Sequence, residues 1–197
     1  MLILGSRLIE APVMSLQTGT RLGQTTKPVI DPGTLRIIAY EVTGPLLTQN
    51  PSFLRTADIR EYGRLGMIID SNDELIGLED VLEVEKYYKL GFPLVGMQVV
   101  DDMKRRVGKV DDYTLETGGY VIQQLNIAKG FFRGFNDTGS LIHRSQIVEI
   151  NDKAIVVKSA TSKSVSPVME NMRNEFVNPF RKPNQMPQPD QDTTSPT

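Results

Sequence analysis

The sequence contains the same pattern of residues twice, and this internal repeat constrains the fold more than any other feature. Four blocks of the first half recur in the second half in the same order, and the offset between matching blocks changes only from 86 to 85 to 88 residues. The matching blocks are LGSRLI (4–9) and LGFPLV (90–95), RLGQ (21–24) and RVGK (106–109), GTLRIIAYEV (33–42) and GGYVIQQLNI (118–127), and LRTADIREYGRLGMII (54–69) and IHRSQIVEINDKAIVV (142–157). Four collinear matches are not expected by chance. The repeat predicts two domains of one fold, at residues 1–84 and 85–160.

Each repeat is predicted to consist of short β-strands. The segment VIQQLNI alternates apolar and polar residues and places Val121, Gln123, Leu125 and Ile127 on one face, which is typical of a half-buried strand. About six such strands per repeat, without a long helical pattern, indicate a small barrel, whose closure removes exposed sheet edges. The predicted fold class is all-β, with two tandem small barrels.

Turns are predicted at equivalent places in the two repeats. Residues 151–153 (Asn-Asp-Lys) have the length of a hairpin turn between two β-branched runs, and residues 61–64 (EYGR) fill the same role in the first repeat. Residues 31–33 and 118–119 contain glycine and mark an earlier turn, where a positive φ is expected.

The segments outside the repeats have a different composition. Residues 73–88 are predicted to hold a short linker helix, with Asp73 as its cap. Residues 161–197 are predicted to be a flexible tail, because the last 17 residues carry four prolines and almost nothing apolar. Within the tail, four apolar residues near helical spacing could dock on a barrel, on a partner or on their own domain. These are Met169, Met172, Phe176 and Phe180.

Composition excludes several classes of protein and site. With 22 Lys and Arg against 24 Asp and Glu, the net charge of −2 argues against a general nucleic-acid coat. The absence of cysteine excludes disulfides and thiolate metal sites, and the single histidine, His143, excludes sites that need two imidazoles. No apolar run approaches the roughly 18 residues of a membrane span. We therefore expect a soluble, cytoplasmic protein, with peripheral membrane association as an alternative.

The charges are divided unevenly between the repeats. Residues 1–85 hold 7 basic and 12 acidic side chains, whereas residues 86–160 hold 11 and 8. Residues 70–85 alone contain seven acids and no base, and this segment is interpreted as a solvated face or a spacer between the barrels. This uneven distribution of charge predicts faces of complementary charge, either between the two barrels or toward a partner.

The chain resembles the PRC-barrel domain family. The resemblance rests on a strand-forming start with Leu-Gly, on Gly23 and Gly108 at the end of the first hairpin, on the alternating strand, and on the segments ADIREY (57–62) and SQIVEI (145–150) before the last hairpin. It covers residues 1–160 as two tandem copies. The family includes the H subunit of the photosynthetic reaction centre and the C-terminal domain of the ribosome maturation factor. What the resemblance implies is a small binding module rather than a chemistry.

No catalytic motif stands out from the sequence, so we expect a protein that is not an enzyme and that binds no cofactor, metal or small-molecule substrate. The pairs 101–102 and 111–112 (Asp-Asp) are candidate acids, but neighbours on a strand point to opposite faces. His143 and Ser145 can share a face, although a nucleophile pair also needs a third, orienting group.

The best functional candidate is the glycine-containing segment KGFFRGFNDTG (129–139). Its aromatic and basic side chains are the types that anchor protein interfaces, and they could also stack on single-stranded bases. The predicted partner-binding residues are Lys129, Phe131, Phe132, Arg133 and Phe135. The alternative is that Phe132 and Phe131 plug one end of a barrel.

A secondary basic patch is predicted at Lys104, Arg105 and Arg106, with a solvated turn as the alternative. Together these features favour a non-enzymatic adaptor that binds a protein partner. A ribosome- or RNA-associated factor and a peripheral component of a membrane complex are the two other hypotheses.

Overall fold

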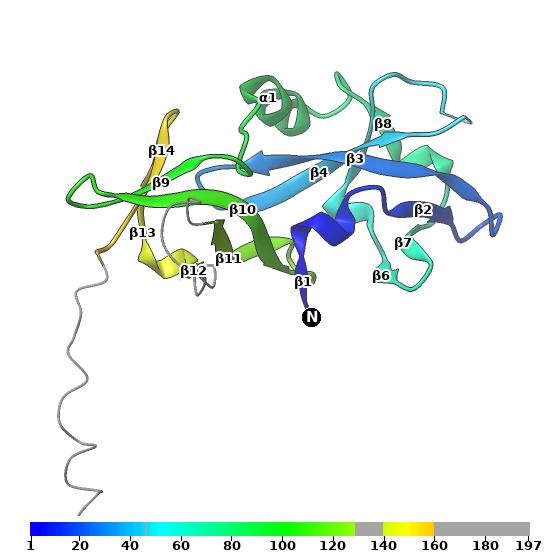
Figure 1. The fold of residues 1–197 in the computed structure, drawn as a ribbon. Helices are drawn as coiled ribbons and strands as arrows, with labels where there is room; N and C mark the ends of the chain where they lie inside the picture. The colour runs from blue at the N-terminus through cyan, green and yellow to red at the C-terminus, as the bar shows by residue number, and fades with distance from the viewer. Residues whose placement is uncertain (46, 129–139, 160–197) are drawn as a thin grey trace, which may run out of the picture. The chain divides into compact units, whose positions relative to one another are not determined.

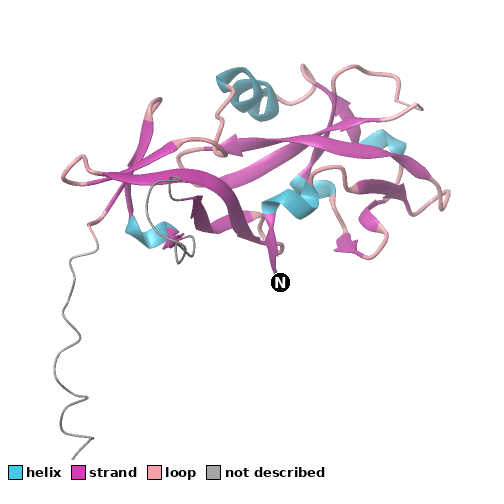
Figure 2. Cartoon of the chain, viewed as in Figure 1, coloured by secondary structure: helices cyan, strands magenta, loops and turns pink. Residues whose placement is uncertain are grey.

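The computed structural model describes residues 1–45, 47–128 and 140–159. Residues Met1–Ser159 form one compact unit. Strands dominate this unit, and its described part contains one α-helix, α1 (Leu82–Leu90) (Figure 2). The all-β class predicted from the sequence is therefore confirmed. The tail predicted at 161–197 lies outside the described residues.

Six strands and one 3-10 turn recur in the same order in the two repeats, as β2–β7 with η2 and as β9–β14 with η4 (Figure 1). The strands of the first repeat are β1 (Leu2–Leu4), β2 (Pro12–Ser15), β3 (Arg21–Asp31), β4 (Arg36–Thr43), β5 (Ser52–Arg55), β6 (Glu61–Gly63), β7 (Gly66–Ile69) and β8 (Leu75–Gly77). Those of the second repeat are β9 (Gln98–Asp101), β10 (Arg106–Glu116), β11 (Val121–Ala128), β12 (Ser140–His143), β13 (Ile147–Ile150) and β14 (Ala154–Val157). The described residues also form four 3-10 turns: η1 (Gly5–Leu8), η2 (Thr56–Asp58), η3 (Asn72–Glu74) and η4 (Arg144–Gln146).

The strand order is symmetric about the junction, because equivalent strands of the two repeats occupy equivalent places on either side of it. It runs β13-β14-β9-β10-β11-β4-β3-β2-β7-β6, so that β4 and β11 are the central pair and every strand outward from β4 has its equivalent outward from β11. The parallel pairs confirm the equivalence, because Val13 lies opposite Met67 in one repeat and Val99 opposite Ile155 in the other. The repeats are thus joined edge to edge around a local two-fold axis.

The junction between the repeats is made by reciprocal backbone hydrogen bonds. The Ile37 amide donates to the Tyr120 carbonyl at 3.0 Å, and the equivalent Ile122 amide donates to the Leu35 carbonyl at 2.8 Å. Leu35 and Tyr120 both adopt φ 53°, in the left-handed region that is uncommon for residues other than glycine. Both side chains are buried, which fixes these conformations in the packed core.

Two turn predictions need correction. The positive φ predicted for the glycine turns falls instead on Leu35 and Tyr120, which follow those glycines and carry side chains that the core needs. The turn predicted at residues 61–64 starts later, because Glu61–Gly63 is already strand β6 and only Arg64 and Leu65 form the turn.

The predicted face of β11 is only partly right. Leu125 and Ile127 are buried as expected, but the buried residue at the start of the strand is Ile122 rather than Val121. A register shift against β10 between Thr114 and Leu115 changes which residues point inward. This is the effect of a β-bulge, which sequence alternation alone does not reveal.

One hydrophobic core serves both repeats. It contains side chains from each half, and the rings of Tyr40 and Tyr120 meet edge to face across the junction with centroids 6.4 Å apart. A second, smaller cluster lies between α1 and the first repeat, where Val84 is fully buried and Phe53 packs on Tyr88 with ring centroids 4.9 Å apart.

The leading segment of each repeat packs on the other repeat. Strand β1 pairs with β10, and α1, which leads into the second repeat, packs on β3, the equivalent of β10 (Figure 1). The helix predicted in the linker is present, but it begins at Leu82, with Val81 at its N-cap and no side-chain cap. Asp73 instead lies in η3, which Ser71 caps. The predicted domain boundary at residue 84 falls inside α1.

Within the described residues, no helix has the length and apolar character needed to cross a membrane.

Candidate functional site

The predicted partner-binding residues cannot be placed in this fold. Lys129, Phe131, Phe132, Arg133 and Phe135 all lie outside the described residues. The strands on either side of them are described: β11 starts at the junction, where Val121 pairs with Arg36, and ends at Ala128.

The predicted basic patch belongs to a tightly bonded turn between β9 and β10. Asp101 is only 6% exposed, and its carboxylate accepts hydrogen bonds from the Arg105 amide at 2.8 Å, the Arg105 Nε at 2.6 Å and the Met103 amide at 2.9 Å. Burial raises the pKa of Asp101, but the hydrogen bonds from Arg105 outweigh it, so the pKa lies below its ordinary value. Lys104 adopts φ 63° in this turn. Arg105 is thus engaged in holding the turn, whereas Arg106 starts β10 at the surface.

The other polar candidates make local or inter-repeat contacts. Asp112 accepts hydrogen bonds from the Ser6 amide at 3.1 Å and its hydroxyl at 2.6 Å, so it links the two repeats. His143 Nδ1 lies 2.8 Å from the Ser145 hydroxyl, and with Gln146 it forms a capping box for η4. Among the described residues there is no group of three or more acidic, His or Cys side chains that could hold a metal.

Two clefts lie at the repeat junction, each with a volume of about 430 Å³. The first, here called the Arg144 cleft, lies between the turn at 32–35 of the first repeat and η4–β13 of the second. The second, here called the Arg60 cleft, lies between the turn at 117–120 of the second repeat and η2–β6 of the first. Each cleft therefore exists only because the two repeats are joined.

The clefts are equivalent under the duplication. The residue pairs that line them are Gly33 and Gly118, Leu35 and Tyr120, Ile147 and Ile59, Val148 and Arg60, Glu149 and Glu61, and Ile150 and Tyr62. Sequence reasoning missed both clefts, although a signal was present. The GTL/GGY block of one repeat and the ADIREY/SQIVEI block of the other contribute the two walls, and only the pairing across the junction brings them together.

Hydrogen bonds and an ion pair organise the Arg60 cleft. Arg60 forms an ion pair with Asp70, the hydroxyl of Tyr62 donates to the Arg7 carbonyl at 3.2 Å, and Glu116 accepts from the Gly118 amide at 2.5 Å. The hydrogen bonds that the Gly118 and Gly119 amides donate to Glu116 hold the pKa of this carboxyl below its ordinary value. Most of the polar side chains that line this cleft form hydrogen bonds or ion pairs within the chain.

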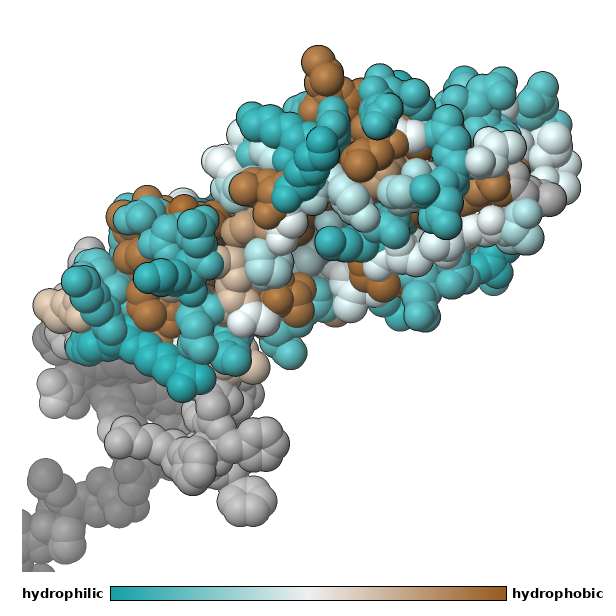
Figure 3. Space-filling model, turned by 90° about the horizontal axis from the view of Figure 1, so that it is seen from above, coloured by the Kyte–Doolittle hydropathy of each residue, from teal (hydrophilic) through white to brown (hydrophobic). Residues whose placement is uncertain are grey.

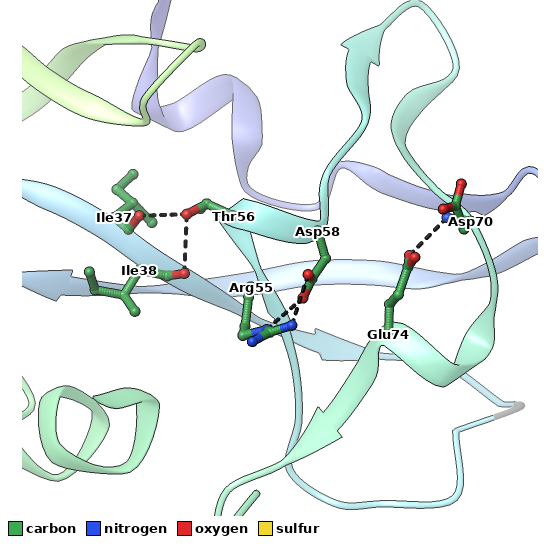
Figure 4. Close-up of polar contacts among 7 residues, drawn as sticks. All are labelled: Ile37, Ile38, Arg55, Thr56, Asp58, Asp70 and Glu74. Atoms are coloured by element: carbon green, nitrogen blue, oxygen red, sulfur yellow. Dashed lines mark hydrogen bonds and ion pairs between the residues drawn. The ribbon is translucent and has the colours of Figure 1, made fainter. Parts of the chain in front are cut away.

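The η2 wall of the Arg60 cleft is fixed to β4 and to its own turn (Figure 4). The buried Thr56 hydroxyl lies 2.9 Å from the Ile37 carbonyl and 3.2 Å from that of Ile38, and Arg55 pairs with Asp58 through two hydrogen bonds of 2.6 and 2.9 Å. Since Ile37 also bonds across the junction, Thr56 couples the wall of the cleft to the repeat interface.

The Arg144 cleft has apolar side chains at two positions where the Arg60 cleft has polar ones. Val148, which is 57% exposed, replaces Arg60, and Ile150 replaces Tyr62. Arg144 spans the junction, because its Nη2 donates to the Thr34 carbonyl at 3.0 Å. Glu149 accepts from the Asn151 side chain at 3.1 Å.

A smaller hollow of about 260 Å³ adjoins the Arg144 cleft and shares Pro32 and Ile150 with it. Its other apolar lining residues are Leu90, Phe92, Pro93 and Met97. We call the cleft and the hollow together the junction groove. Seen from above, the surface is largely hydrophilic, with hydrophobic side chains in separate patches (Figure 3).

Compared with models of known families, the second repeat matches the PRC-barrel domain over residues 91–163. Residues 91–163 form a PRC-barrel domain. This domain supplies η4, β13 and most of the hollow, whereas Pro32 and Leu35 of the junction groove come from outside it. No curated protein matches the chain.

Proposed function

We propose that the chain is a non-enzymatic adaptor that binds a protein partner through two tandem PRC-type barrels. Three features support a second PRC-type barrel in residues 1–84: the strand order, the parallel pair β2–β7 that matches β9–β14, and equivalent glycines. A Cβ on Gly23 would lie 2.5 Å from the Thr43 carbonyl, and one on Gly108 would lie 2.5 Å from the Ala128 carbonyl. Both repeats therefore require glycine at the same close approach of two strands.

The junction groove is the observation that carries this proposal. Its lining includes two exposed apolar side chains, Val148 and Leu90, together with polar residues such as Arg144 and Asp152. A mixture of apolar and polar side chains is typical of surfaces that bind other proteins. The polar candidates for chemistry, by contrast, are engaged in structural bonds: Asp101 holds a turn, Asp112 links the repeats and His143 caps η4. These contacts favour recognition over catalysis.

The residues at 129–135 remain a second candidate contact. Strand β11 connects the junction to this segment: its first residue, Val121, pairs with Arg36, and its last residue, Ala128, directly precedes residue 129. Ala128 pairs with Lys109, which pairs in turn with Gln98, the neighbour of Met97 in the hollow. We treat the junction groove and residues 129–135 as two contacts of one adaptor.

The test compares two exposed aliphatic positions. Val148→Glu places a charge in the junction groove, whereas Leu16→Glu makes the same change at a residue that is 61% exposed in the β2–β3 turn, away from both clefts. Tagged wild-type chain and both variants are used to capture partners from lysate of the source cells, and the captured protein is then purified and its affinity for each chain measured. We expect wild type and Leu16→Glu to bind equally and Val148→Glu to bind at least about ten-fold more weakly.

Treatments of the lysate distinguish the other two functions. Loss of capture after nuclease, with affinity that falls steeply as salt rises, would identify an RNA-associated factor instead. Loss of capture in detergent would identify a component of a membrane complex. Equal binding by Val148→Glu and wild type would exclude the junction groove as the contact surface.

A further inference from the structure

The hollow beside the Arg144 cleft has an equivalent place in the first repeat, and a tyrosine of the chain itself lies there. Tyr62 pairs with Met67 in β6–β7, and Ile150 pairs with Ile155 in β13–β14, so Tyr62 and Ile150 occupy the same position. Tyr62 is half-buried against the core, and its hydroxyl donates to the Arg7 carbonyl at 3.2 Å. The side chain of Ile150 is shorter and leaves the space of about 260 Å³ open.

The residues around the carbonyl that accepts the Tyr62 hydroxyl have equivalents in the second half, although Arg7 lies in η1 and Pro93 lies in an irregular segment. Leu8 and Leu94 are both buried, and the amides of Glu10 and Gly96 donate to the equivalent carbonyls of Thr25 and Val110 at 2.9 and 2.8 Å. Arg7 and Pro93, which precede the two leucines, are therefore equivalent. Pro93 lines the hollow. A phenol placed in the hollow would lie beside Pro93, and the polar residues Asn151 and Asp152 also line it.

The chemistry and size of the hollow suit one aromatic side chain. Phe92 offers an aromatic face, Met97 a thioether and Leu90 an aliphatic edge, all of which pack favourably on a ring. A volume of about 260 Å³ is below the roughly 300–1,000 Å³ of sites for drug-sized ligands.

We propose that this hollow accepts a tyrosine side chain from the protein partner, with the tyrosine hydroxyl donating to the Pro93 carbonyl. The inference rests on the proposed function, since it names the partner residue that an adaptor of this kind would recognise. The first repeat supplies the template: Tyr62 does within the chain what the partner's tyrosine does between chains. Neighbouring partner residues then run along the Arg144 cleft past Val148.

The hollow can be tested without the partner by using p-cresol, which is the tyrosine side chain alone, in an NMR titration of the full chain. We expect p-cresol to shift the amides of residues 90–97 and 150–152, and toluene, which lacks the hydroxyl, to bind about three- to ten-fold more weakly. In Ile150→Tyr the new side chain fills the hollow, as Tyr62 does in the first repeat, and p-cresol binding is lost. The control Leu16→Tyr adds the same ring at an exposed position away from the junction groove and leaves p-cresol binding unchanged.

A second variant guards against misfolding of Ile150→Tyr. Leu90 is 55% exposed at the rim, so Leu90→Glu is expected to leave the amide spectrum well dispersed and to weaken p-cresol at least about ten-fold. Shifts that appear elsewhere, or that are equal in wild type and both hollow variants, overturn the proposal.

The affinity of the captured partner for the variants distinguishes a failure of this inference from a failure of the proposed function. If the partner binds wild type but also binds Ile150→Tyr with the same affinity, the tyrosine contact is wrong and the adaptor function stands. If p-cresol occupies the hollow but no protein partner binds the chain, the adaptor function fails and so does the partner's tyrosine. Loss of partner binding in Ile150→Tyr and Leu90→Glu, with retention in Leu16→Glu, is the result expected.

Discussion

Leu35 and Tyr120 hold the same backbone conformation on opposite sides of the junction, and each accepts a hydrogen bond from the strand of the other repeat. Glycine would adopt φ 53° without strain, whereas a residue with a Cβ is destabilised there by roughly 1–2 kcal/mol. The side chains are retained because they are buried in the shared core. The junction thus combines local strain with tertiary packing.

This conflict predicts an unusual order of stability at Leu35. Leu35→Ala removes buried atoms and keeps the strained φ, so we expect the free energy of unfolding to fall by about 2–5 kcal/mol. Leu35→Gly removes the same packing and relieves the strain, so it should be equal to Leu35→Ala or up to about 1 kcal/mol more stable. Urea unfolding measures both. At the buried strand residue Ile37 the order should be the ordinary one, with glycine about 0.5–1 kcal/mol below alanine, and a glycine deficit at Leu35 as well would contradict the strain.

The repeated glycine of the first hairpin predicts a second effect on stability. In Gly108→Ala the new Cβ would meet the Ala128 carbonyl and the Ile127 side chain at 2.5 Å, so the strands must separate, with an expected loss of about 1–3 kcal/mol. Gly23→Ala should behave alike, because its Cβ would meet the Thr43 carbonyl at 2.5 Å. Gly63→Ala is the control, since its Cβ finds only the Glu61 carboxylate at 3.6 Å. Thermal unfolding of the three variants gives the comparison, and a neutral Gly108→Ala would show that β10 and β11 are not so closely packed.

Buried tyrosines predict a loss of stability at high pH. Burial, followed by the nearby Tyr62, raises the pKa of Tyr120 from its ordinary value of 10.0 to about 12. The folded chain therefore holds a proton that the unfolded chain releases between about pH 10 and 12, so this stabilisation is complete below pH 10 and is lost as pH rises toward 12. Tyr120→Phe removes this contribution. The decline in unfolding free energy above pH 10 should become shallower by about 1.4 kcal/mol per pH unit, as urea midpoints between pH 8 and 11.5 would show. An unchanged slope would mean that Tyr120 titrates normally.

The aromatic segment predicts a change in binding rather than in folding. Replacing Phe131, Phe132 and Phe135 with Ser is expected to lower partner recovery per folded molecule while the thermal midpoint changes little. The measurement pairs capture of the partner with circular dichroism of the same sample. If folding collapses while recovery per folded molecule is unchanged, the phenylalanines are core residues and the binding role is wrong.

The sequence predicted the strands and their order of appearance well, because alternation and offset are local signals. Leu125 and Ile127 are buried as their spacing implies, and the turn at 151–153 lies between β13 and β14. The bulge that buries Ile122 was not predictable, since it depends on the register of β10 against β11. The start of α1 at Leu82 was also missed, because packing of Val84 against Phe53, rather than a cap, determines which residues form the helix.

The candidate surface was the least predictable part. The junction groove combines Pro32 and Leu35 with residues more than a hundred positions later, such as Val148 and Ile150, and only the pairing of β4 with β11 brings them together. The residues around Ile150 and those around Tyr62 predict the same strand and turn, so the local sequence does not show that only one of the two positions borders a hollow. The difference between the two clefts becomes visible only when the repeats are compared residue by residue in space.

The palindromic strand order has a consequence for stoichiometry. A homodimer of identical barrels joined in this way would carry two identical recognition sites, and any substitution would alter both together. Covalent fusion of the two halves releases that constraint, so one site can be closed by Tyr62 while its twin keeps the smaller Ile150. The proposed tyrosine site therefore predicts one partner per molecule, whereas a symmetric counterpart would carry two equal sites and bind two.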